Sequence, residues 1–268
     1  MQPASAPSIQ VRDLRFKLDA VPKHWHGGRR SVTLFFDNLS VFFPPGERFF
    51  VAAVKAFQQK VTDEKLAADV AAFCGQEGHH SREHVRYNKM LEEQGYPAQK
   101  LEKRVANLLK VVTRRASKSR QLAATCALEH FTSLMGTLVL ENPRTLEGAH
   151  PELAALWRWH AAEENEHKSV AFDVFKAIGG SYFRRAFVMF TTTIVFWAMV
   201  FVQQVELMRA DGILFSPREW FALFRFLFLE PGGMAGLFRP YLSYYRPSFH
   251  PSEHDTRELV ERWVQASL

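Results

Sequence analysis

Residues 74–84 read CGQEGHHSREH and residues 159–175 read WHAAEENEHKSVAFDVF, and these two stretches decide the fold. Each contains a Glu-x-x-His motif, formed by Glu77 with His80 and by Glu164 with His167. Side chains three positions apart on an α-helix lie on adjoining turns of one face, so each motif can present a carboxylate and an imidazole to the same small volume. These polar residues interrupt segments that are otherwise apolar enough to be buried. The pattern therefore predicts a polar site inside a helical protein.

The chain around these motifs has the periodicity of helices. Apolar residues recur three and four positions apart between residues 31 and 180, and Pro and Gly separate the segments. No credible alternation of strands is present, so an all-α bundle is expected. The sequence predicts helices on either side of a break at 44–46, a helix over about 64–94, one over 101–140 with a bend near 116–119, and one over 151–179.

Two further glutamates, Glu47 and Glu129, lie on the remaining helical segments. The order along the chain is Glu, Glu-x-x-His, Glu, Glu-x-x-His, which is the arrangement by which four-helix bundles hold two carboxylate-bridged metal ions. Four carboxylates in a dry interior are very costly unless cations pair with them, and two divalent ions cancel their charge. Mixed oxygen and nitrogen ligation suits iron or manganese, with zinc as an alternative. The expected cofactor is therefore a pair of Fe ions, with Mn or Zn as replacements.

Two histidines extend this candidate ligand set. His160 lies four residues before Glu164 and seven before His167, on the same helical face, so it is a candidate seventh ligand. His84 stands in the same relation to Glu77, and it is either an additional ligand or a residue that holds a ligand from behind. For each of them, an ordinary hydrogen-bonded core histidine is the competing interpretation.

A single Glu-x-x-His motif in a helical protein usually lies on a solvated face. Two motifs with two correctly interleaved glutamates form a different case, and together they favour metal binding over surface ion pairs. Glu163 and Glu166 point away from the helical stripe of the ligands, so we expect them to be solvated. Cys74 and Cys126, the two cysteines of the chain, exclude a disulfide framework and are expected to be small buried hydrophobic residues.

The segments PPGERFF (44–50), CGQEGHHSREH, ALEHF (127–131) and WHAAEENEHKSVAFDVF resemble those of bacterial ferritin-like proteins catalogued as predicted metal-dependent hydrolases. The resemblance extends over nearly the whole chain from about Val11. The ligand order is also similar to that of the di-iron arylamine N-oxygenases. The resemblance implies that one metal is held by Glu47, Glu77 and His80 and the other by Glu129, His160, Glu164 and His167, with some glutamates bridging. Glu47 departs from the family pattern, because it follows Pro-Pro-Gly near an expected helix start, whereas mid-helix is usual.

The last third of the chain is unusually apolar. Residues 186–202 read AFVMFTTTIVFWAMVFV, seventeen residues without a charge. A membrane span needs about twenty apolar residues, so the length of this stretch is borderline. It fits a membrane span, a buried core helix or a helix that lies within one leaflet. Residues 217–229 are rich in Phe, and residues 99–121 hold eight Lys or Arg against one Glu. A basic run is usually a solvated face, but together these segments fit an anionic membrane surface, and no pattern for nucleic acid is present.

We expect three regions: an irregular arm over 1–30, a ferritin-like di-metal bundle over 31–180, and an apolar helical extension over 181–268. The predicted function is O2-dependent oxidation of a small organic or lipid-like substrate, which requires an unidentified electron donor. The alternatives are hydrolysis by a di-metal-activated water and non-catalytic metal binding by a membrane-associated bundle. The modest charge of +6, the two cysteines and the absence of a secretory pattern predict the cytoplasm or the inner face of the cell membrane. The oligomeric state stays open, with a homodimer as one option.

Overall fold

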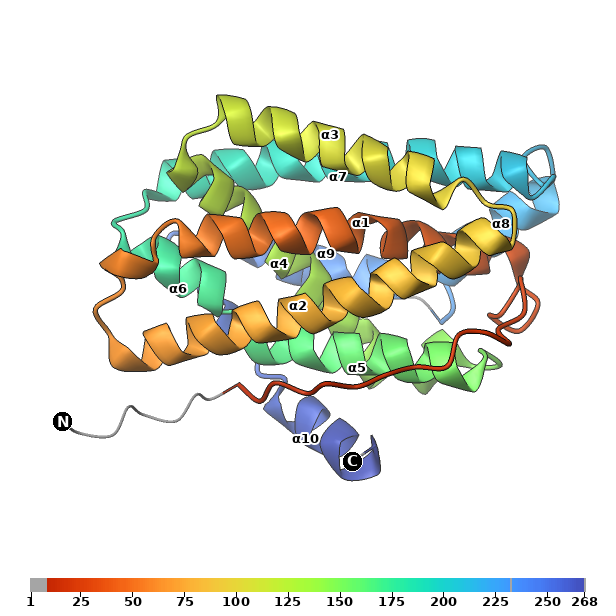
Figure 1. Cartoon of the computed structure of the whole chain (residues 1–268), viewed down its shortest axis with the longest axis horizontal. Helices are drawn as coiled ribbons and strands as arrows, with labels where there is room; N and C mark the ends of the chain where they lie inside the picture. Colours follow the sequence, from red (N-terminus) through yellow and green to blue (C-terminus); the bar gives the residue numbers. More distant parts are fainter. Residues whose placement is uncertain (1–8, 232, 268) are drawn as a thin grey trace.

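A computed structural model describes residues 9–231 and 233–267 of the chain (Figure 1). These residues form helices joined by short connections and contain no β-strand, only one isolated bridge between His26 and Ala149. The predicted all-α fold class is confirmed. The α-helices are α1 (Arg30–Lys55), α2 (Glu64–Glu93), α3 (Ala98–Arg115), α4 (Lys118–Glu141), α5 (Pro151–His167), α6 (Val170–Ala177), α7 (Tyr182–Ala210), α8 (Pro217–Phe228), α9 (Phe238–Ser243) and α10 (Arg257–Ser267). Short 3-10 helices cover Gln58–Lys60, Pro143–Leu146, Met234–Leu237 and Pro251–Glu253.

Helices α1, α2, α4 and α5 form the predicted four-helix bundle. α1 packs on α2 and α4 packs on α5, and the two pairs meet through contacts of α1 with α4 and of α2 with α5. In Figure 1, α1, α2 and α5 run along the long axis, and α3 and α7 lie above them. Of the C-terminal helices, α7 packs on α1 and α4, α8 on α1, and α10 on α5. The extension therefore covers the bundle on several sides.

Helix α1 continues through Pro44 and Pro45, where the sequence predicts a break. A proline inside a helix has no N–H to donate to the carbonyl four residues earlier, so Pro44 leaves the Ser40 carbonyl without its helical donor. Asn88 of α2 replaces that donor, because its Nδ2 donates to the Ser40 carbonyl oxygen at 3.4 Å. The predicted break is wrong, and Glu47 consequently lies inside a continuous helix rather than at a helix start.

Two of the predicted long helices are divided. The backbone of Ala116 is extended, with φ −92° and ψ 141°, and it ends α3. Ser117 then caps α4 by accepting a hydrogen bond from the backbone N–H of Arg120, which satisfies one of the free donors at a helix start. The helix predicted over 101–140 is therefore broken rather than bent. The helix predicted over 151–179 is likewise divided, into α5 and α6.

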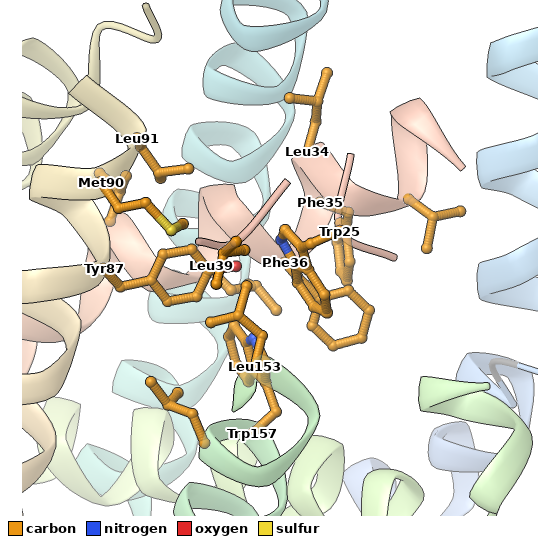
Figure 2. Close-up of a cluster of buried hydrophobic side chains, with 14 of the residues drawn as sticks. Trp25, Leu34, Phe35, Phe36, Leu39, Tyr87, Met90, Leu91, Leu153 and Trp157 are labelled. Carbon is orange, nitrogen blue, oxygen red and sulfur yellow. The ribbon is translucent and has the colours of Figure 1, made fainter. Parts of the chain in front are cut away.

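The main apolar core lies where residues 9–29 cross the bundle. Figure 2 shows Trp25 of this arm beside Phe36 of α1, with Tyr87 of α2 nearby. The ring centroids of Trp25 and Phe36 are 5.6 Å apart, in an edge-to-face arrangement. The Trp25 indole N–H and the Tyr87 hydroxyl both donate to Oδ1 of Asp37, at 2.9 and 2.7 Å. The arm has no helix in its described part, and it belongs to the core.

Two helices of the described chain are long and apolar enough to cross a membrane by length and composition, α4 and α7. The most apolar window of α4 is 67% buried, so α4 is a core helix of the bundle. The corresponding window of α7 is only 17% buried. The two helices thus both have the length and apolar composition of a membrane span, but their surroundings differ strongly.

Candidate metal centre

The predicted ligands come from four helices and all lie in the interior. Each of these residues is at most 2% exposed. Glu47 lies on α1, Glu77 and His80 on α2, Glu129 on α4, and His160, Glu164 and His167 on α5. Removing several carboxylates from water is costly unless positive charge accompanies them, so this burial needs a physical explanation.

The imidazole of His167 lies among three of the carboxylates. Its Nε2 is 3.4 Å from Oε1 of Glu77, 3.4 Å from Oε2 of Glu129 and 3.6 Å from Oε2 of Glu164. Potential ligand atoms of Glu77, Glu164 and His167 all lie within 4.8 Å of one another. This group is small enough for one cation to touch every member.

A second group lies beside the first. Potential ligand atoms of Glu47, Glu77 and His80 lie within 4.8 Å of one another, and so do those of His80, His160 and Glu164. His80 Nδ1 is 3.8 Å from Oε1 of Glu164. Glu77 and Glu164 therefore belong to both the first and the second group, which is the position of a bridging carboxylate between two ions.

Eight buried polar atoms of described residues at this centre have no hydrogen-bond partner. They are both carboxylate oxygens of Glu47, Glu77 and Glu129, together with Nδ1 of His80 and Nε2 of His167. Buried polar atoms are nearly always hydrogen-bonded, because an unpaired one costs about 1–3 kcal/mol. Carboxylate oxygens and imidazole nitrogens that converge in this way fit divalent cations, which bind such donors.

Two of these imidazoles are held from behind by a hydrogen bond. His80 Nε2 lies 3.0 Å from Oε2 of Glu163, and His167 Nδ1 lies 2.8 Å from Oε1 of Gln76. A histidine that donates one ring N–H to such an oxygen presents the lone pair of its other nitrogen to a metal. In both residues that other nitrogen is one of the unpaired atoms. Glu163 and Gln76 therefore set the orientation expected of ligands.

Glu163 is fully buried, so the prediction that it is solvated is wrong. Residues 9–29 cover the face of α5 that was expected to be open, and Arg12 from this arm lies 3.3 Å from Oε1 of Glu163. Arg12 also lies 2.6 Å from Oε1 of Glu166, whose side chain is only 13% exposed, so the same prediction fails there. The arm thus supplies a cation that fixes the carboxylate behind His80.

His160 and His84 form a hydrogen-bonded pair. His160 Nε2 lies 2.9 Å from Oε1 of Glu164, and its Nδ1 lies 2.7 Å from Nε2 of His84. Ser40 Oγ lies 2.9 Å from the other ring nitrogen of His84. His160 is thus adjacent to a predicted bridging carboxylate, while His84 orients His160 from behind. Potential ligand atoms of both histidines and of Glu47 still fall within 4.8 Å of one another.

Burial dominates the proton affinities at the centre. It raises the pKa of Glu47 and Glu77 well above the usual value, and neighbouring carboxylates raise both further. Burial also raises the pKa of Glu129, to about 7. Burial acts in the same direction on Glu164, but the charges and hydrogen bonds of His167 and His160 together outweigh it, so the pKa of Glu164 is lowered. Most of these carboxylates therefore need added positive charge to be ionised at neutral pH.

A protein-family model described as "Predicted metal-dependent hydrolase" matches residues 10–255 of the chain. The chain belongs to this family. No curated protein and no solved structure matches it. The match confirms the resemblance to this family over nearly the whole chain. The family description names metal-dependent hydrolysis, which is the alternative in the sequence analysis and not the oxygenase. The similarity to the arylamine N-oxygenases stays a prediction.

In this member of the family, the centre is reached from two sides. A small, mostly apolar cavity of about 70 Å³ is lined by Phe43, Thr132, His160 and Glu164, among others. A more polar and open pocket of about 360 Å³ reaches Glu47 and Glu77 from another side, and Arg48, Lys55 and Ser81 belong to its walls. The apolar cavity therefore approaches the centre at Glu164, and the polar pocket approaches it at Glu47 and Glu77.

Sequence reasoning missed the residues that support the ligands: Gln76, Glu163, Arg12 and Thr132. Gln76 directly precedes Glu77, and Glu163 directly precedes Glu164, so each stands one place before a predicted ligand. This repeated placement is the one sequence feature that could have identified Gln76 and Glu163. Thr132 Oγ1 donates to Oε2 of Glu164 from another helix, and no spacing along the chain indicates this contact.

Proposed function

We propose that the protein is an enzyme that uses two divalent metal ions held between α1, α2, α4 and α5. The proposed ligands are Glu47, Glu77, His80, Glu129, His160, Glu164 and His167, with Glu77 and Glu164 bridging. The convergence of eight unpaired buried atoms on one volume carries this proposal. Four carboxylates and two divalent ions balance in charge if the histidines are neutral, which removes the cost of burial. Bound there, the ions would supply Lewis acidity and lower the pKa of a water molecule.

The family description supports hydrolysis as the reaction. Hydrolysis of an ester adds water across the acyl C–O bond and yields an acid and an alcohol. The polar pocket supports this assignment, since it gives water a path to Glu47 and Glu77. Thr132, through its hydrogen bond to Glu164, keeps one carboxylate oriented toward the smaller apolar cavity.

Oxidation by O2 is the second candidate, and the donor set supports it. Four carboxylates with imidazoles are the ligands of di-iron bundles, and Fe²⁺ with open positions is suited to O2 chemistry. The apolar cavity beside His160 and Glu164 would keep water from the reacting group. This reaction needs an external electron donor, whereas hydrolysis needs none, so the two candidates differ in a measurable requirement.

Elemental analysis of the purified protein tests the metal centre. We expect about two metal ions per chain, the number held by two-metal sites, and their loss in Glu77→Ala and in Glu164→Ala. Glu93→Ala is the matched control, because Glu93 lies on the same helix as Glu77 and its side chain is 65% exposed. No metal in any preparation, or equal metal content in all variants, contradicts the proposal.

The reaction is tested with p-nitrophenyl esters of increasing chain length, under nitrogen and in air. A hydrolase loaded with its metal releases p-nitrophenol equally well in both atmospheres. An oxygenase instead consumes O2 when it is given Fe²⁺, a reductant and an apolar substrate. Stoichiometric metal without either activity identifies the third alternative, a non-catalytic metal-binding bundle, and refutes the enzyme assignment.

A further inference from the structure

A large apolar cavity of about 350 Å³ lies between α1, α3, α4 and α7. This volume is within the range of about 300–1,000 Å³ typical of small-molecule pockets. Arg120 is the one charged residue among the described residues that line it, and three threonines are the other side chains with polar groups. The apolar walls include Phe42, Phe50, Leu109, Leu128, Val195 and Met199. Such walls select a ligand whose bound part is hydrocarbon.

This cavity adjoins the metal centre. Leu39, Phe43, Thr132 and Met135 line both it and the small cavity that reaches His160 and Glu164. Thr132 contacts Glu164 directly, because its hydroxyl donates to that carboxylate. The large cavity also borders Gly46, the residue before Glu47. A chain in the cavity would thus pass beside the proposed ligands.

The lining residues Phe187 and Val195 of α7 are exposed, and Leu108, Leu109 and Val112 of α3 are half-buried, so the cavity opens between these two helices. At one end of this opening, Arg104 of α3 pairs with Glu206 of α7 at 2.7 Å. At the other end, where α3 has ended, Arg184 of α7 donates to Ser119 Oγ in the first turn of α4 at 2.6 Å. Between these contacts the cavity walls are apolar residues of both helices, and Phe187, with 66% of its surface exposed, lies at the rim. The opening is therefore a slot along the helices, closed at both ends by polar contacts.

The outer face of α7 beside this slot is an exposed apolar stripe. Phe183, Phe187, Phe190, Ile194 and Phe201 are each more than half exposed. They recur at intervals of four, three, four and seven residues, which puts them on one face of the helix. A soluble surface rarely exposes so many large apolar side chains side by side, and such a patch marks a partner or a membrane.

α7 is not suited to crossing a bilayer alone, because its opposite face is packed on the bundle. Gln203 and Gln204 of that face are buried and donate to the carbonyl oxygens of Leu101 and Ser31, at 3.3 and 3.1 Å. A helix that packs one face on its own protein, with polar side chains in that face, and exposes an apolar face opposite is suited to lie in the plane of a lipid surface. The neighbouring α3 and the first turn of α4 carry exposed cations suited to anionic headgroups: Lys103, Lys110, Arg114, Arg115, Lys118 and Arg120.

We infer that the slot between α3 and α7 admits the single hydrocarbon chain of an anionic lipid, taken directly from an anionic membrane surface on which the α7 stripe rests. The chain occupies the large cavity, and Arg120 at the rim holds its negatively charged head. That this lipid is the substrate rests on the proposed function. That it binds does not, since neither the cavity nor the stripe includes a proposed metal ligand.

Binding of palmitate to the metal-depleted full-length protein tests the cavity. Ala124→Phe fills part of the cavity, and we expect it to weaken binding about tenfold or more, because the added ring occupies space that the chain needs. Ala198→Phe, an exposed position on α7 that does not line the cavity, is the matched control and should bind like the unchanged protein. Equal weakening in both variants, or no palmitate binding at all, overturns the inference.

Arg120→Glu provides a second variant that leaves the interior unchanged, because Arg120 is exposed. It should weaken palmitate binding but not the binding of hexadecanol, which has the same chain and no charge. An equal effect on both ligands, or no effect on either, refutes the role of Arg120 at the rim.

Sedimentation with vesicles tests the source of the lipid. We expect the protein to pellet with mixed phosphatidylcholine and phosphatidylglycerol vesicles, and the double variant Phe190→Ser with Ile194→Ser to lose most of this binding. Val85→Ser on α2, which also removes an exposed apolar side chain, should have no effect. Palmitate binding without vesicle binding overturns the membrane as the source.

The proposed metal centre and the proposed lipid cavity can be tested independently of each other. Glu77→Ala should lose metal and keep palmitate binding, and Ala124→Phe should lose palmitate binding and keep metal. Loss of both properties in both variants contradicts the separation of the cavity from the ligands.

Discussion

Two regions of this molecule invert the usual distribution of side chains. At the metal centre, acids and imidazoles are buried, and on the outer face of α7, phenylalanines are exposed. Most proteins place these residue types the other way round, so a buried charge or an exposed apolar patch is the informative observation. Each inversion raises the free energy of the isolated chain, and a binding partner would relieve it. Under our proposals, the centre binds cations and the face of α7 binds apolar material.

The largest expected effect is a difference in the stability cost of truncating a side chain in α4 and in α7, the two helices of the described chain that are long and apolar enough to cross a membrane. Leu122→Ala in α4 removes a fully buried side chain and should lower the free energy of unfolding by about 2–5 kcal/mol. Ile194→Ala in α7 removes a side chain that is 55% exposed and should cost about 0.5 kcal/mol or less. Urea unfolding of the two variants measures the difference. Equal costs would mean that the face of α7 is covered in solution.

The next effect concerns the free energy of unfolding of the metal-depleted protein and its dependence on pH. Burial raises the pKa of Glu129 from its usual 4.5 to about 7 in the folded chain. Between these pH values the folded chain retains a proton that the unfolded chain has released, so the free energy of unfolding should fall as the pH rises from about 5 to about 7. Glu129→Gln should reduce this slope. A free energy of unfolding that rises over this interval, or an unchanged slope in the variant, contradicts the argument.

A smaller effect, on metal affinity, is expected from changing Glu163, which holds His80 in place. Glu163→Gln keeps the shape of the side chain but removes the negative charge that orients His80 and pairs with Arg12. Metal affinity should fall about 10–100-fold, as for other residues that hold a ligand in place. Competition with a chelator measures the affinity, and Glu93→Gln on exposed α2 surface is the control. The same affinity in both variants would show that Glu163 does not act on the centre.

The smallest expected effect is that of ionic strength, which should change the binding of α7 to vesicles but not the metal content of the centre. Vesicle binding should weaken as the ionic strength rises, since the Debye length falls from about 10 Å at 0.1 M to about 3 Å at 1 M. Metal content should not change over the same range, because the centre is buried. Vesicle binding that is insensitive to salt would exclude a role for the cations of α3.

The bundle and its ligand spacing could be predicted from the sequence because both depend on local periodicity. Glu77 with His80, and Glu164 with His167, lie one helical turn apart, and that relation holds wherever the helices are packed. The predicted break at Pro44 failed because its compensation, the donor from Asn88, comes from another helix.

Contacts between distant parts of the chain could not be predicted from helical periodicity either. Arg12 meets Glu163 across 151 positions, so nothing in the local pattern of α5 shows that Glu163 is covered. Likewise, the apolar run of α7 has the same composition whether it is buried like α4 or exposed. The sequence identifies what a helix face carries, and only tertiary packing decides what that face meets.

Anomalous X-ray diffraction from crystals of the protein purified with its metal tests the central claim most directly. We predict two anomalous peaks about 3.5–4 Å apart, the separation usual for two-metal sites, lying between Glu47, Glu77, Glu129 and Glu164. Crystals whose protein contains metal by elemental analysis but that show no peak at this position would contradict the account.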